Sequence, residues 1–172
     1  DVIVTMLADG FATGPLIEDS VVQAAVSPGA VWVDMSSAKP EHAREQGAVL
    51  AAIGIAHLDA PVSGGTKGAE AGTLAIMVGG TEEAFAKVRD VLEAMGRPVQ
   101  VGPSGTGQLS KLANQTIVAV TIGAVAEAML LVQQGGADPA AVRAALKGGF
   151  ADSTILQQHG ERMTEGNFEP GG

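Results

Sequence analysis

Short, nearly continuous apolar runs alternate with segments of helical periodicity along the first hundred residues. Apolar runs that lack polar alternation are typical of strands buried on both faces, as in parallel sheets. The expected strands are 2–7, 30–35, 56–59, 74–78 and 98–101, and the expected helices are 17–26, 40–53 and 81–95. This order predicts an α/β layered sheet that is at least partly parallel. Ser36 or Ser37 is the expected N-cap of the helix at 40–53.

The pattern changes near residues 102–106, where we expect a domain boundary that separates 1–103 from 104–172. A stretch from Gly107 to Gln134 contains no helix breaker except Gly123 and predicts one long helix. Asp138 and Pro139 then open a further helix, and a third helix is expected at 153–163. The second part of the chain is therefore expected to be all-helical.

Charge and composition exclude several classes of partner. The formal net charge is −9, from 10 basic and 19 acidic residues, which argues against nucleic acid or an anionic membrane as the main partner. The absence of cysteine excludes disulfides and thiol chemistry and fits a cytoplasmic protein. No apolar run is expected to reach the length of a membrane span. The chain opens in a strand without an initiator Met and ends without a capping element, so we expect it to be cut at both ends.

A glycine-rich loop follows the expected strand at 56–59. Gly64 and Gly65 lack a Cβ, so their backbone N–H groups can approach an anion closely, and the Ser63 hydroxyl adds a donor. This combination suits a substrate carboxylate. An ordinary flexible turn explains the local pattern equally well. The loop is neither a P-loop nor a dinucleotide fingerprint, because neither G-K-[ST] nor G-x-G-x-x-G is present.

Lys111 and Asn114 share one face of the expected long helix. A Lys whose pKa is lowered by burial can exchange a proton with an alcohol or carbonyl oxygen, and Asn114 can donate to the same ligand. Spacing alone favours a solvated Lys beside an ordinary Asn. However, Lys111 and Glu127 are the only charged residues from Leu109 to Leu131. We expect so apolar a helix to be mostly buried, which makes a functional Lys111 more plausible.

The remaining polar candidates are weaker. His57 lies in a short strand and is more often structural in such a place. His42 and His159 have no partners at metal-ligand spacing, so we expect no metal site. Glu127 is better explained by a structural hydrogen bond or an interface than by catalysis.

Four ordered motifs resemble the β-hydroxyacid dehydrogenase family, which includes 3-hydroxyisobutyrate dehydrogenase and tartronate semialdehyde reductase. Their order and spacing match along essentially the whole chain. The motifs are 34–37 (Asp-Met-Ser-Ser), 59–65 (Asp-Ala-Pro-Val-Ser-Gly-Gly), 72–80 with its paired glycines at the end, and 105–114 from Gly-Thr-Gly-Gln to Lys-Leu-Ala-Asn.

The resemblance implies a Rossmann-type sheet, here partial, followed by a long interdomain helix and an all-helical domain. It implies an NAD- or NADP-dependent enzyme that interconverts a small 3-hydroxy acid and its semialdehyde. Lys111 matches the catalytic lysine, Asn114 matches a substrate-positioning residue, and the loop residues match the substrate-carboxylate site. These loop residues are Ser63, Gly64 and Gly65.

The resemblance also implies where the cofactor binds. Leu7 and Ala8 match a loop that contacts the cofactor, and Ser37 matches a residue beside the nicotinamide. The family's G-x-G-x-x-G turn is not in this sequence. The full-length protein is expected to be a homo-oligomer. Two alternatives stay open: a non-catalytic binding or assembly module on the same scaffold, and a 6-phosphogluconate-dehydrogenase-like enzyme. The phosphate-binding basic residues of the latter are not evident.

Overall fold

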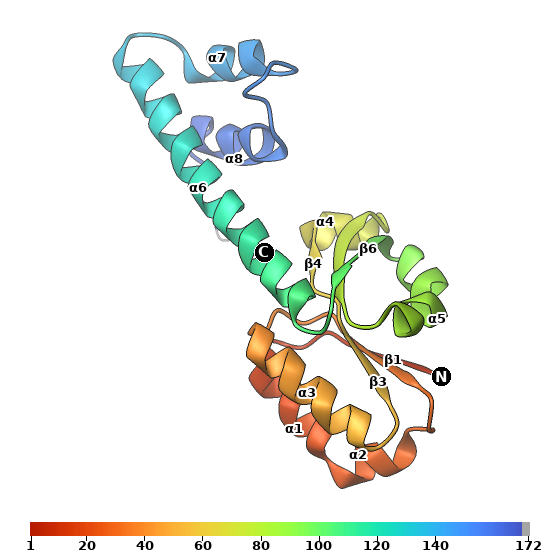
Figure 1. The fold of residues 1–172 in the computed structure, drawn as a ribbon. Coiled ribbons are helices and arrows are strands. Elements are labelled where there is room, and N and C mark those ends of the chain that lie inside the picture. Colours follow the sequence, from red (N-terminus) through yellow and green to blue (C-terminus); the bar gives the residue numbers. More distant parts are fainter. Residues whose placement is uncertain (170–172) are drawn as a thin grey trace. The chain divides into compact units, whose positions relative to one another are not determined.

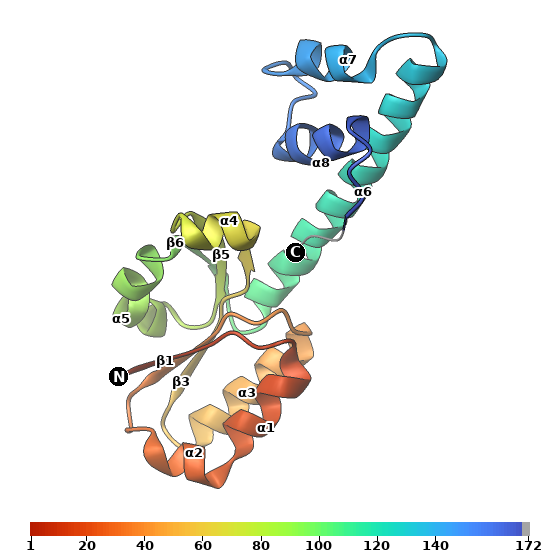
Figure 2. The same cartoon turned by 180° about the vertical axis from the view of Figure 1, so that it is seen from behind.

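The computed structural model describes residues 1–169, which form two compact units, 1–113 and 114–169 (Figures 1 and 2). The last three residues of the tail, where a cut end was expected, lie outside the described part. Each unit is considered by itself below.

The first unit is built on a mixed six-stranded sheet (Figure 1). Its strands are β1 (Val2–Thr5), β2 (Val31–Asp34), β3 (Ala56–Asp59), β4 (Val62–Ser63), β5 (Leu74–Gly79) and β6 (Gly96–Gly102). The order is β1-β2-β3-β5-β4, and β6 pairs with β5. Strands β1, β2 and β3 are parallel, β5 runs antiparallel to β3 and β4, and β6 is parallel to β5. The prediction of a partly parallel α/β sheet is confirmed.

Helices cover both faces of this sheet because successive strand residues point to opposite sides. On one face Trp32 packs with Ile17 and Leu50, which come from α1 (Gly10–Glu18) and α3 (Pro40–Ala52). On the other face Val33 and Leu58 pack with residues of α5 (Glu82–Glu93). Strands β2 and β3, which carry these residues, are therefore buried on both faces. This explains why their sequences are nearly continuous apolar runs.

The expected helix at 17–26 is wrong in both its start and its continuity. Helix α1 begins at Gly10, because the Asp9 carboxylate accepts hydrogen bonds from the N–H groups of Phe11 (2.9 Å) and Ala12 (3.0 Å). A second helix, α2 (Ser20–Ala25), starts anew at Asp19, whose side chain accepts from two N–H groups in the same way. Two aspartate caps thus divide a segment whose apolar spacing suggested one helix.

The serine cap expected for α3 is also wrong. Lys39 occupies the N-cap position and makes no side-chain cap bond. The hydroxyl of Ser36 instead accepts from the N–H of Leu7, 2.8 Å away, and so ties the end of β2 to the end of β1. The glycine-rich loop is more regular than expected, because it contains β4 and the short helix α4 (Gly65–Glu70).

Helix α6 (Thr106–Gln134) is the single long helix that the sequence predicts, but it is not mostly buried. Only 11% of its most apolar stretch is buried, and Leu109, Ile117 and Leu131 are among its exposed side chains. The expectation that no run approaches a membrane span is wrong as well. Length and composition would let α6 cross a bilayer, a weak criterion that core helices of soluble proteins also meet.

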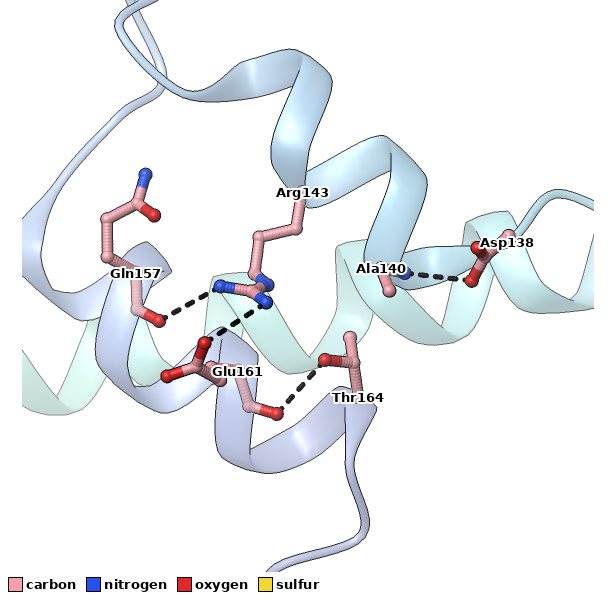
Figure 3. A network of polar contacts seen from close by, with 6 residues as sticks. All are labelled: Asp138, Ala140, Arg143, Gln157, Glu161 and Thr164. Carbon is pink, nitrogen blue, oxygen red and sulfur yellow. Dashed lines mark hydrogen bonds and ion pairs between the residues drawn. The ribbon is translucent and has the colours of Figure 1, made fainter.

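In the second unit, α7 (Pro139–Leu146) and α8 (Thr154–Thr164) are joined by Arg143 (Figure 3). Its Nη1 donates to the carbonyl of Gln157 (3.3 Å), and its Nη2 pairs with Oε1 of Glu161 (3.4 Å). Asp138 caps α7 through the N–H of Ala140, 3.0 Å away, as predicted. Val125 and Met129 of α6 form a small apolar cluster with Leu156 of α8.

Candidate functional site

The predicted site residues of the first unit lie beyond the carboxyl ends of three adjacent parallel strands. Leu7 and Ala8 follow β1, Ser36 and Ser37 follow β2, and the glycine-rich segment follows β3. Because carboxyl ends of parallel strands meet at the same edge of a sheet, the topology gathers these loops together. This edge is the usual place for ligands in open α/β sheets.

Lys111 of α6 lies against the glycine-rich segment. Its Nζ donates to the backbone carbonyl of Val62, 2.6 Å away, and Val62 directly precedes Ser63. Partial burial lowers the pKa of Lys111, because removing water disfavours the charged ammonium. The structure therefore brings Lys111 next to the segment predicted to hold a carboxylate, although the two are far apart in sequence.

The backbone of the segment requires glycine at two successive positions. Gly64 has φ 139° and Gly65 has φ 61°, both in the region that favours glycine. Both glycines are exposed, whereas Ser63 is half-buried. A Cβ on Gly64 would also lie 3.2 Å from Cδ2 of Leu74. The paired glycines therefore have a conformational reason, and they leave their backbone open to an approaching ligand.

Asn114 lies three residues beyond Lys111 in the sequence and is the first residue of the second unit. Its side chain is half-buried, and Nδ2 donates to Oε1 of Gln115, 3.1 Å away. The residue is thus held by a neighbour on its own helix.

The predicted cofactor residues line the end of β1 and β2. Leu7, Ala8 and Ser37 are exposed, whereas Ser36 is fully buried and holds the Leu7 N–H. These exposed positions on adjacent strand ends are accessible to a bound cofactor. The first turn of α1 does not fit a pyrophosphate, because the carboxylate of Asp9 already accepts from its N–H groups.

Asp59 and Gln108 were not identified from the sequence as functional residues, yet they organise the site. Asp59 is fully buried and accepts from the N–H groups of Gly105 (2.7 Å) and Gln108 (2.9 Å), so it caps the helix that carries Lys111. Burial raises the pKa of the Asp59 carboxyl, while these backbone hydrogen bonds act in the opposite direction. The Gln108 side chain donates to Ser36 O (2.8 Å) and accepts from Ala38 N (2.9 Å).

Close backbone packing around Asp59 accounts for two further glycines of the motifs. A Cβ on Gly79 would lie 2.5 Å from Oδ1 of Asp59, and one on Gly107 would lie 2.3 Å from its carbonyl oxygen. Neither position has room for a side chain. A buried carboxylate at a strand end, followed later by two glycine pairs, is the sequence signal for this arrangement.

The other polar candidates lie elsewhere. His57 is buried, and desolvation lowers its pKa to about 4, against a smaller opposing effect of Asp34. Glu127 is exposed on α6. Within residues 1–169, no group of three or more His, Asp or Glu side chains is arranged to hold a metal ion.

Two family models together match the whole chain. The NAD binding domain of 6-phosphogluconate dehydrogenase matches residues 1–105, and the NAD-binding domain of NADP-dependent 3-hydroxyisobutyrate dehydrogenase matches residues 105–172. The chain is 50% identical over 144 residues to 2-hydroxy-3-oxopropionate reductase of Escherichia coli, which covers 83% of the chain and 49% of that protein. It is 39% identical to the uncharacterized oxidoreductase YkwC of Bacillus subtilis, over 99% of the chain and 60% of that protein.

Solved structures agree with these matches. A 3-hydroxyisobutyrate dehydrogenase of Mycobacterium tuberculosis, solved with L-serine, has a TM-score of 0.86 and 33% identity, over 99% of this chain and 60% of that one. The chain thus spans about half the length of the curated relatives it matches. With this agreement of sequence motifs, sheet topology and relatives, the chain belongs to the β-hydroxyacid dehydrogenase family.

Proposed function

We propose that the protein containing this chain is an NAD- or NADP-dependent oxidoreductase that interconverts a small 3-hydroxy acid and its semialdehyde. The observation that carries this proposal is the 2.6 Å bond from Lys111 Nζ to Val62, which places an ammonium group beside Ser63 and the paired glycines. The relatives named for this chemistry support the proposal, among them the reductase of E. coli and 3-hydroxyisobutyrate dehydrogenase of Pseudomonas aeruginosa.

The substrate carboxylate is assigned to Ser63, Gly64 and Gly65. The hydroxyl of Ser63 and the accessible glycine backbone supply uncharged donors, and the two glycines have no side chain to block a ligand. The nearby ammonium of Lys111 adds attraction for an anion. A small acid therefore binds with its carboxylate at the loop and its hydroxyl-bearing carbon toward the helix.

Lys111 is assigned the proton transfer. It protonates the carbonyl oxygen during reduction and accepts the hydroxyl proton during oxidation, and the lowered pKa brings both forms of the amine closer to neutral pH. When bound, NAD(P) supplies or accepts the hydride. Asn114 is assigned to orient the substrate, and Leu7, Ala8 and Ser37 are assigned to the nicotinamide edge.

The domains, location and assembly follow the same assignment. Residues 1–103 form the C-terminal part of the NAD(P)-binding domain, and residues 104–172 begin the helical domain. We expect a cytoplasmic homo-oligomer that acts on a small carboxylate and uses neither nucleic acid nor a membrane as a partner. The net charge of −9 argues against nucleic acid or an anionic membrane as a partner, and the absence of cysteine fits a cytoplasmic protein.

A second candidate is a 6-phosphogluconate-dehydrogenase-like enzyme, favoured by the family model that matches residues 1–105. Its substrate carries a phosphate, which calls for several basic side chains near the site. The acidic overall charge and the small uncharged donors at Ser63–Gly65 favour a smaller acid.

Substrate profiling of the full-length protein tests the proposal. Reduced cofactor is followed by absorbance, with NAD and NADP each paired with glycerate, 3-hydroxyisobutyrate, L-serine and 6-phosphogluconate. Turnover of one of the three small acids at a kcat/KM well above that of 6-phosphogluconate is expected. Preference for 6-phosphogluconate would select the second candidate, and no turnover with any pair would favour a non-catalytic module.

A further inference from the structure

A cavity of about 580 Å³ lies in the first unit, apart from the candidate substrate site. Helix α3, the start of β3 and the segments after β5 and β6 form its walls. Its lining includes Arg44, Gly47, Ala51, His57 and Ser104, and none of the described residues assigned above to substrate or cofactor lines it. Its volume is that of a small-molecule site.

The imidazole of His57 at this cavity is buried without compensation. Neither Nδ1 nor Nε2 has a hydrogen-bond partner within residues 1–169. An unpaired buried polar group is costly, and each one calls for an explanation. With a pKa of about 4, the ring is neutral near pH 7 and offers one donor and one acceptor. Both nitrogens are enclosed, so a polar ligand atom can satisfy them when the ring or the backbone beside it shifts slightly.

Gly47 keeps the polar end of the cavity open. A Cβ at this position would lie 3.4 Å from Oγ of Ser104 and 3.5 Å from Nδ1 of His57, both ordinary contact distances. Sterics therefore do not demand glycine in the middle of α3, where glycine is unfavourable. Its lack of a side chain keeps a Cβ out of the position between the hydroxyl and the imidazole.

The charge at the cavity favours an anion. Arg44 is the cation among the lining residues, and no acidic side chain of the described chain lines the cavity. Its bond to Glu41 (3.2 Å) is a solvent-exposed ion pair, which holds the guanidinium only weakly. Ala48, Ala51 and Ile55 form an apolar wall.

We propose that this cavity binds a small organic carboxylate with an apolar body. The carboxylate lies between Arg44, Ser104 and His57, and the body lies against the apolar side of α3. This site is separate from the proposed dehydrogenase site, and its occupant is distinct from the substrate held at Ser63–Gly65.

The test uses benzoate as the probe, titrated into the protein while backbone amide shifts are followed by NMR. Saturable shifts are expected at residues 44–57 and 102–104. Benzyl alcohol, which has the same ring without the charge, is expected to bind about tenfold more weakly. Arg44→Gln should weaken benzoate binding by a similar factor. The matched control is Arg89→Gln, which removes another half-exposed arginine in a surface ion pair and should have no effect.

Two further variants separate this site from the substrate loop. Gly47→Ala preserves the fold, as its amide spectrum will show, and should reduce benzoate binding by filling the space beside His57. Lys111→Ala should leave benzoate binding unchanged, so failure of the dehydrogenase assignment and failure of this one are distinguishable. Absence of saturable shifts, equal affinity for the two probes, equal effects of Arg44→Gln and Arg89→Gln, or shifts confined to residues 62–67 would each overturn the proposal.

Discussion

Lys111 combines partial burial with a hydrogen bond to a backbone carbonyl, and both set its chemistry. Burial lowers the pKa of the ammonium group, while the carbonyl of Val62 fixes the position of Nζ. A freely rotating surface lysine has neither property. Both properties support the proposed role of Lys111 in proton transfer, whereas its sequence spacing alone favours an ordinary solvated lysine.

His57 predicts a pH dependence of stability. Its folded pKa of about 4 lies below the ordinary histidine value of 6.5, so the unfolded chain binds the proton first as the pH falls. The contribution of the neutral His57 ring to the free energy of unfolding is fully present above pH 6.5. It is lost as the pH falls through the folded pKa, and the total loss is roughly 3 kcal/mol. Urea unfolding across this range measures the loss.

The difference between His57→Gln and the parent protein isolates this contribution, because other titrating groups are common to both. The free energy of unfolding should depend less steeply on pH in His57→Gln than in the parent protein. Equal slopes in His57→Gln and the parent would show that His57 does not titrate in this way.

At the scale of elements, two glycines at the cavity have opposite requirements. Gly47→Ala should stabilise the protein by about 0.5–1 kcal/mol, because alanine favours the helix and its Cβ meets only ordinary contacts. Gly80→Ala should destabilise it by on the order of 1–3 kcal/mol, because φ is 140° and the Cβ would lie 2.4 Å from Cδ2 of Leu58. The denaturant midpoint of each variant measures its change in stability. A change of the same sign in both variants would contradict the backbone geometry at these two glycines.

The start of α6 is held by Gln108, which links it to the end of β2. Gln108→Ala would leave the carbonyl of Ser36 and the N–H of Ala38 without their partner, at a cost of about 1–3 kcal/mol. Because α6 carries Lys111, kcat should fall more than KM rises. Gln133→Ala on the exposed part of the same helix is the control. Unchanged stability and turnover in Gln108→Ala would contradict the proposed structural role of Gln108.

Periodicity predicted most elements because buried strands and long helices leave regular patterns. The strands β2, β3 and β5 and the helix α6 were predicted within a few residues. The starts of α1 and α2 were not predicted correctly. Asp9 and Asp19 cap these helices through local hydrogen bonds, which periodicity does not show. Strand β4 has two residues and forms only by pairing with β5, so tertiary contacts rather than local sequence determine it.

Several large apolar side chains of the described chain are exposed, and many of them lie on α6. Ile117, Val120 and Leu131 of α6 are each about two-thirds exposed or more, at 65%, 68% and 71%. Large exposed apolar surfaces promote association. Light scattering should therefore give this chain on its own a mass above the monomer, and substituting all three residues by Gln should shift it toward the monomer. A monomeric parent chain would contradict this expectation.

The site divides into parts that sequence reasoning reached and parts that it did not. The sequence predicts the loop residues and Lys111 because they lie in ordered motifs, and their roles stay predictions. The roles of Asp59 and Gln108 were not, because hydrogen bonds across 46 to 72 residues depend on the fold. The Asp59 carboxylate caps α6 only because the fold brings the start of α6 beside the end of β3.

Turnover of Lys111→Met in the full-length protein tests the central assignment most directly. Measured with the preferred acid and cofactor, kcat should fall by about 10²–10⁴-fold, while the melting temperature stays close to that of the parent. Lys87→Met, at an exposed ion pair on α5, is the matched control and should keep full turnover. A kcat for Lys111→Met within a few-fold of the parent would contradict the role of Lys111 as the general acid and base.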